Sequence, residues 1–294
     1  MEWLLRLVTT LAIVSSAHPV LRTRAMLSKT TLLEAWLWGV VAICLWGLTW
    51  CASDLFPIAP KGLADQLWLA SAVLMLSPFV AALGSRRPGS RVWSFFVVLP
   101  VILVLMLPAV TAWNRDLRPT PLRVETPMVA GYTLVLVMGA GNYFGTRFAV
   151  PALLVAGASL TVVWPLSELG ERYPVAGSST LHAAATVAVS IAAWLGAHQA
   201  AKTKSSRQNP LNTVWSDFRD FFGIAWGRRV MDRMNHTAQE EGWPVRLQFE
   251  GFVPVDSASP SELSPDPRAR VEQALRWLLR RFVDPEWIDE RMAG

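Results

Sequence analysis

The stretch that decides the fold is residues 35–53, AWLWGVVAICLWGLTWCAS, which holds no charged side chain. A helix that crosses the hydrocarbon core of a bilayer needs about 20 mostly apolar residues. Five further stretches of this kind follow along the chain. We expect spanning helices at about 35–53, 66–85, 92–113, 127–145, 148–166 and 180–199. Soluble proteins rarely contain even one such stretch, so the sequence predicts an all-α polytopic membrane protein.

The charged residues are concentrated in the last third of the chain. The 294 residues include 27 Lys and Arg and 22 Asp and Glu, and 14 of each sign lie in the last 94 residues. The charged fraction is 17%, against roughly 25% in an average soluble domain. This pattern excludes a single soluble globule, a disordered chain and a disulfide-rich secreted domain. We expect a six-helix membrane domain over 32–200, a basic linker over 201–210 and a small α+β tail over 211–294.

The loops between the expected spans alternate in charge. The segments 20–31, 84–91, 141–147 and 201–210 are basic and hold no acidic residue, whereas the intervening loops are mixed or acidic. Loops rich in Lys and Arg tend to stay in the cytoplasm. The sequence therefore predicts a multi-pass protein of the cytoplasmic (inner) membrane with a cytoplasmic C-terminal tail.

Residues 1–31 admit three interpretations. Their charge-free stretch is short for a span, but it becomes long enough for a seventh helix if the flanking charge extends to the interface. A signal peptide cleaved at Ser15-Ser16-Ala17 is disfavoured, because Arg22 and Arg24 would then lie outside the cell. A natural start at Met26 is the third alternative. The sequence alone leaves the seventh helix and the later start open.

The tail alternates between helical and strand patterns. We expect a helix at 212–241, a strand at 244–253, a flexible loop at 254–267, a helix at 268–282 and a short turn at 285–292. The first helix carries an aromatic seam, defined here as Trp215, Phe218, Phe222 and Trp226. The seam could lie among lipid head groups or pack against the rest of the chain, and the helix's mixed charge favours packing. Because so small a tail has little core to cover the seam, we also expect the seam to dock a protein partner.

Few side chains indicate chemistry. No metal-ligand cluster, nucleophile motif or nucleotide-binding loop is recognisable, so we expect no metal and no cofactor. No ionisable residue falls at the middle of a span. His182 and His198 lie toward opposite ends of the last span and are expected to be interfacial.

The glycine-rich turn at 139–147 is the most distinctive part of the membrane domain. It is interpreted as a tight hairpin between two spans. A weaker hypothesis is a site for an anionic ligand, in which Asn142 and Arg147 face Arg228 and Arg229 of the tail.

Three classes of function remain. The prediction is a non-catalytic anchor or assembly component that docks a partner through its tail. The alternative is a transporter or flippase-like protein for a lipid or apolar solute, with helices loosened by Pro78, Pro100 and Pro108. An enzyme acting on an anionic lipid head group is the least supported, because no activated base or nucleophile is identified. Membrane lipids are the expected partners, and the neutral tail argues against nucleic acid. The sequence indicates neither a cargo nor an oligomeric state.

Overall fold

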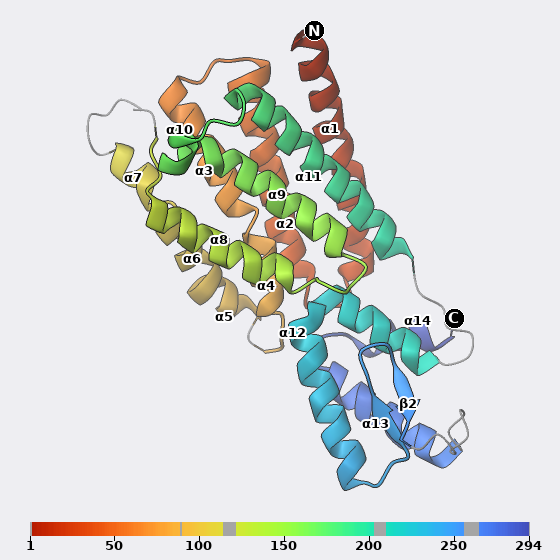
Figure 1. Ribbon diagram of the computed structural model, residues 1–294. Helices are drawn as coiled ribbons and strands as arrows, with labels where there is room; N and C mark the ends of the chain where they lie inside the picture. Colours follow the sequence, from red (N-terminus) through yellow and green to blue (C-terminus); the bar gives the residue numbers. More distant parts are fainter. Residues whose placement is uncertain (1, 89, 114–121, 203–209, 256–264, 294) are drawn as a thin grey trace.

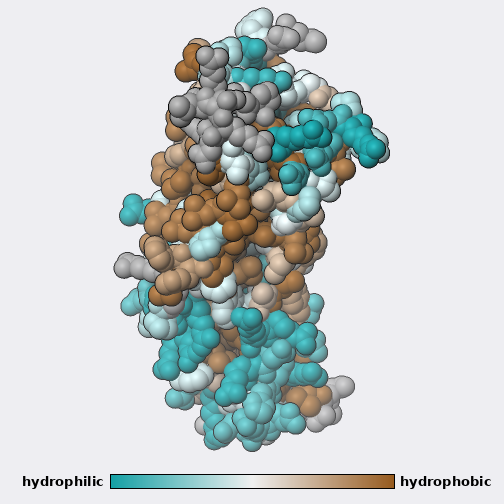
Figure 2. Space-filling model, turned by 90° about the vertical axis from the view of Figure 1, so that its left-hand side faces the viewer, coloured by the Kyte–Doolittle hydropathy of each residue, from teal (hydrophilic) through white to brown (hydrophobic). Residues whose placement is uncertain are grey.

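The computed structural model describes residues 2–88, 90–113, 122–202, 210–255 and 265–293. A bundle of helices forms one part of the molecule, and the C-terminal tail lies against one end of that bundle (Figure 1). Five helices are long and apolar enough to cross a membrane: Trp3–Leu27, Leu33–Leu55, Lys61–Leu83, Ala149–Leu166 and Ser178–Ala201. They fit the predicted all-α membrane class. Figure 2 shows a band of hydrophobic residues across the bundle and a mostly hydrophilic tail.

The helical elements of the bundle follow the order of the chain. They are α1 (Glu2–Leu27), α2 (Leu33–Trp50) with its π-helical extension η1 (Cys51–Leu55), α3 (Lys61–Leu74), α4 (Ser77–Leu83), α5 (Ser90–Trp93), the π-helical η2 (Ser94–Val98), α6 (Leu99–Leu105), α7 (Leu107–Trp113), α8 (Thr126–Gly141), α9 (Ala149–Val163), the 3-10 turn η3 (Trp164–Leu166), α10 (Glu168–Arg172) and α11 (Ser178–Ala201).

Two of the six expected spans are shorter than predicted. The segment expected at 92–113 is divided into α5, η2, α6 and α7. Pro100 and Pro108 lie in the first turns of α6 and α7, where each lacks the N–H that would bond to the preceding turn. The span expected at 127–145 ends already at Gly141, because the residues after it turn toward the tail.

The N-terminal segment is helical and belongs to the bundle. Helix α1 packs beside α11 and α2. The Trp36 indole N–H donates to the carbonyl of Val20 at 2.8 Å, and that of Trp50 donates to the Thr10 hydroxyl at 3.0 Å. Of the interpretations of residues 1–31, an additional apolar helix is the one that matches this packing.

The tail consists of a long helix, a hairpin and two shorter helices. Its elements are α12 (Pro210–Glu240), β1 (Val245–Leu247), β2 (Phe252–Pro254), α13 (Pro265–Leu279) and α14 (Pro285–Ala293). The single strand expected at 244–253 is instead two short antiparallel strands, in which Leu247 pairs with Phe252. Most of the expected linker (201–210) and of the expected loop (254–267) falls outside the described residues.

The tail is joined to the bundle by backbone hydrogen bonds. The Thr31 N–H donates to the Phe282 carbonyl at 2.9 Å, and the Asp284 N–H donates to the Lys29 carbonyl at 2.9 Å. A third bond runs from the Arg87 N–H to the Arg281 carbonyl at 2.8 Å. The loops before α2 and after α4 therefore lie at the same end of the bundle as the tail. We call this end the tail side.

The aromatic seam is covered by the chain itself. Trp215, Phe218 and Phe222 are fully buried, and Trp226 is 8% exposed. The ring of Phe282 contacts three of these four rings, and the Trp226 indole donates to the carbonyl of Ala82 in α4 at 3.3 Å. Packing was the interpretation that the sequence favoured for the seam. The role in partner docking is not carried forward, because a partner cannot reach these rings while the tail stays folded.

Candidate functional site

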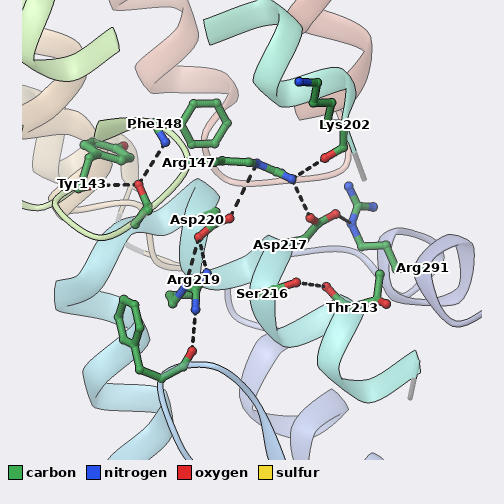
Figure 3. A network of polar contacts seen from close by, with 12 residues as sticks. Tyr143, Arg147, Phe148, Lys202, Thr213, Ser216, Asp217, Arg219, Asp220 and Arg291 are labelled. Carbon is green, nitrogen blue, oxygen red and sulfur yellow. Dashed lines mark hydrogen bonds and ion pairs between the residues drawn. The ribbon is translucent and has the colours of Figure 1, made fainter. Parts of the chain in front are cut away.

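A buried network of ion pairs joins the turn between α8 and α9 to the tail (Figure 3). Arg147 comes from that turn and its side chain is only 5% exposed. Its Nη1 lies 3.0 Å from Asp217 Oδ1, and its Nε lies 3.8 Å from Asp220 Oδ2. Both carboxylates belong to the first half of α12. Arg147 thereby holds the long helix of the tail against the membrane part.

Two arginines of the tail complete the network. The Arg291 Nε donates to Asp217 at 2.7 Å, and Arg219 donates to Asp220 through Nε and Nη2 at 3.0 and 2.7 Å. Burial lowers the pKa of Arg291, and the charge of Asp217 opposes that shift. We call Arg147, Asp217, Arg219, Asp220 and Arg291 the junction network. Three guanidinium groups facing two carboxylates leave it with one excess positive charge.

Residue 223 allows α12 to bend around the turn. Gly223 has φ +79° and ψ 178°, a conformation that is essentially restricted to glycine. A Cβ at this position would lie 2.1 Å from the Asn142 side-chain nitrogen. Asn142 in turn donates from Nδ2 to the Phe222 carbonyl and accepts from the N–H groups of Ile224 and Ala225. Asn142 therefore caps the second half of α12.

An apolar cavity of about 310 Å³ lies between α1, α2, α4, α9 and α11. The cavity-facing residues include Val20, Trp36, Gly39, Pro151, Gly196 and Phe221. Three aromatic residues line its tail-side end: Tyr143, Phe148 and Phe221. The Arg147 guanidinium lies over the rings of Phe148 and Phe221, 5.3 and 5.0 Å from their centroids. The cavity and the junction network thus share a wall.

Tyr143 belongs to the turn itself. Burial raises the pKa of this phenol to about 12. The group therefore stays neutral at physiological pH, and no charge from it enters the cavity.

A second polar cluster lies at the opposite end of the bundle. His182 Nδ1 is 3.3 Å from Asp54 Oδ1, and the Trp68 indole donates to Asp54 Oδ2 at 3.2 Å. The His182 ring stacks on Trp68 with centroids 4.2 Å apart. All three side chains are buried, and His182 Nε2 has no hydrogen-bond partner among the described residues. The sequence predicted an interfacial His182 but did not indicate its pairing with Asp54.

The four residues predicted to contact an anionic ligand each have contacts within the protein. Asn142 and Arg147 do meet the tail, but Asn142 caps α12 and Arg147 faces two carboxylates that an anion would have to displace. Arg228 is exposed and pairs with Asp232 at 3.0 Å. Arg229 is exposed over the ring of Trp226. The grouping of these four residues around an anionic ligand stays a prediction.

Neither metal ligands nor similarity to known proteins assigns a function to the described residues. Among the described residues, no group of three or more His, Cys, Asp or Glu side chains could hold a metal ion. Comparison of the chain with protein-family models, with curated proteins and with solved structures gave no significant match in any of the three.

Proposed function

We propose that this protein holds the apolar part of a membrane lipid in the cavity between α1, α2, α4, α9 and α11. The observation that carries the proposal is the cavity itself. Its volume of about 310 Å³ is at the lower end of the roughly 300–1,000 Å³ typical of ligand pockets. Its walls are almost entirely apolar, and the apolar molecules available beside a membrane helix are lipid chains.

The tail serves as a fixed base for this cavity in the proposal. Phe221 of α12 closes the tail-side end together with Tyr143 and Phe148. The junction network holds α12 in place, and the three backbone hydrogen bonds hold the connection between α13 and α14. The anchoring part of the sequence-based prediction is retained in this form. Docking of a partner through the aromatic seam is replaced by a lipid-binding or lipid-transport role.

The orientation is also part of the proposal. The loops on the tail side carry the basic residues, which favours the cytoplasm for this side. With α1 as a further crossing, the seven apolar helical segments α1, α2–η1, α3–α4, α5–α7, α8, α9 and α11 would cross the membrane. The N-terminus would then lie opposite the tail, which agrees with its place in Figure 1. The cavity would open among the lipids of the cytoplasmic leaflet.

The test measures lipid that stays bound when the protein leaves the membrane. The full chain is reconstituted in phosphatidylcholine vesicles, extracted in mild detergent and examined by native mass spectrometry. Gly196→Leu fills the cavity, because a Cβ at Gly196 meets only Pro151 Cβ at 4.0 Å. Gly157→Leu is the matched control, since this position has open space around it and does not line the cavity.

We expect one phosphatidylcholine on the wild type and on Gly157→Leu, and none on Gly196→Leu. Thermal unfolding is measured for all three proteins to confirm that each of them is folded. Wild-type protein without lipid, or a folded Gly196→Leu variant that retains as much lipid as the control, would contradict the proposal.

A further inference from the structure

Resting on this proposed function, we infer that the cavity takes an ester-linked lipid, whose acyl carbonyl accepts a hydrogen bond from the Tyr143 hydroxyl. The juxtaposition that carries this inference is an apolar cavity whose wall holds one hydroxyl without a partner among the described residues. Occupancy of the cavity by a chain is tested separately, by the Gly196→Leu variant described above.

Three side chains of the cavity wall carry a hydrogen-bond donor: Thr23, Trp36 and Tyr143. The Thr23 hydroxyl and the Trp36 indole both donate to the backbone carbonyl of Val20, at 2.7 and 2.8 Å. The Tyr143 hydroxyl has no hydrogen-bond partner in the part of the chain that the structure describes. Tyr143 therefore supplies the one free side-chain donor of the described wall.

The surroundings of Tyr143 keep its hydroxyl away from bulk water. Its ring packs against two other residues of the wall, with its centroid 6.1 Å from that of Phe79 and 6.5 Å from that of Phe148 (Figure 3). Burial raises the pKa of the phenol to about 12. A buried donor that lacks an acceptor is unfavourable, so an occupant of the cavity that brings an acceptor gains affinity.

Water is a poor partner for this hydroxyl. A buried water molecule typically makes two to four hydrogen bonds to polar groups. The donors of Thr23 and Trp36 are already engaged, and the other side chains of the described wall are apolar. A carbonyl oxygen at the end of an apolar chain satisfies the phenol without requiring a second polar group in the wall.

The place of Tyr143 along the cavity matches the polar end of an acyl chain. Tyr143 lies at the tail-side end, and the lining residues of α2 run inward from Leu32 to Ile43, on the order of 16 Å at 1.5 Å per residue. The cavity is thus elongated along the helices, as an acyl chain is. In a glycerolipid the ester carbonyl stands at the beginning of each chain, next to the head group. A lipid with its head group toward the tail side therefore presents this carbonyl near Tyr143.

The test compares two phosphatidylcholines with chains of equal length, one ester-linked and one ether-linked. They share the head group, and the ether-linked lipid lacks the carbonyl oxygens. The full chain is reconstituted in vesicles with equal amounts of both and extracted in mild detergent, and the retained lipid is identified by native mass spectrometry. We expect the wild type to retain the ester-linked lipid in roughly three- to tenfold excess, the equivalent of one net hydrogen bond. Tyr143→Phe should bring this ratio close to one.

Tyr132→Phe is the matched control. Tyr132 is a buried tyrosine of the same bundle, but its hydroxyl donates to the Ala72 carbonyl at 3.1 Å and the residue does not line the cavity. This variant should keep the wild-type ratio. Thermal unfolding of both variants verifies that they are folded. A folded Tyr143→Phe variant with the wild-type ratio, or a Tyr132→Phe ratio that falls as far, would overturn the inference.

The remaining outcomes separate the inference from the function on which it rests. Equal retention of the two lipids by the wild type, with both lost in Gly196→Leu, would overturn the hydrogen bond to the ester and leave the cavity as a lipid site. Retention of neither lipid by the wild type would overturn both.

Discussion

Replacement of Asp217 by Ala tests whether the junction network holds the tail to the membrane part. Asp217 is 1% exposed and faces Arg147 at 3.0 Å and Arg291 at 2.7 Å. The variant leaves three buried guanidinium groups facing one carboxylate. Removing one partner of a buried ion pair costs about 3–5 kcal/mol. Asp232→Ala is the matched control, because Asp232 belongs to the same helix but forms an exposed pair with Arg228, worth about 0–1 kcal/mol.

The assay is hydrogen exchange of the α12 amides in the reconstituted full chain. Amides that exchange through opening of the tail become faster in proportion to the opening equilibrium. A loss of about 3–5 kcal/mol corresponds to an acceleration of between two and four orders of magnitude, at about 1.4 kcal/mol for each factor of ten. The control should stay within roughly fivefold of the wild type. An Asp217→Ala variant that exchanges as slowly as the Asp232→Ala variant would refute the structural role of the network.

Three further predictions follow from single positions. Gly223→Ala should destabilise the tail by roughly 2–6 kcal/mol, because it combines a glycine-only conformation with a Cβ 2.1 Å from Asn142. Gly141→Ala, with open space around it, should have little effect in the same hydrogen-exchange measurement. Burial raises the pKa of Tyr143 to about 12, so its contribution to stability is complete below about pH 10 and is lost as the pH rises toward 12. In an ultraviolet titration of the folded protein, tyrosinate formation in the wild type and in Tyr143→Phe should therefore coincide up to about pH 11, and earlier divergence would contradict the burial. Asp54→Ala removes the acceptor of the Trp68 indole and should lower the free energy of unfolding by about 1–3 kcal/mol. Asp54→Asn, which keeps an acceptor oxygen, should lose less in thermal unfolding, and equal losses would refute the role of that hydrogen bond.

The sequence predicted the apolar helices well because their signal is local. The long charge-free stretches coincide with four of the five helices that could cross a membrane, and the fifth is α1. The signal was weaker where proline interrupts an apolar run. Uninterrupted hydropathy over 92–113 predicted one regular helix, but Pro100 and Pro108 lack N–H groups and interrupt its α-helical hydrogen bonding.

The candidate site was much less predictable, because its contacts join distant parts of the chain. Arg147 was singled out from its glycine-rich turn, yet its partner Asp217 is 70 residues away. Asp217 and Asp220 lie on a helix of mixed charge, and a helical pattern alone does not show which face another element will cover. Asp54 and His182 are 128 residues apart and carry no common motif. The cavity arises from five elements at once, so no local sequence pattern predicted it.

The central claim is that a lipid chain occupies the cavity, and photo-crosslinking in a bilayer tests it most directly. The full chain is reconstituted with a phosphatidylcholine that carries a diazirine in its acyl chain, irradiated, and mapped by peptide mass spectrometry. We expect labelling of cavity-facing positions such as Ala152 and Ala193, and loss of that label in Gly196→Leu but not in Gly157→Leu. Label confined to outward-facing residues such as Leu103 and Leu134, and unchanged by Gly196→Leu, would contradict the account.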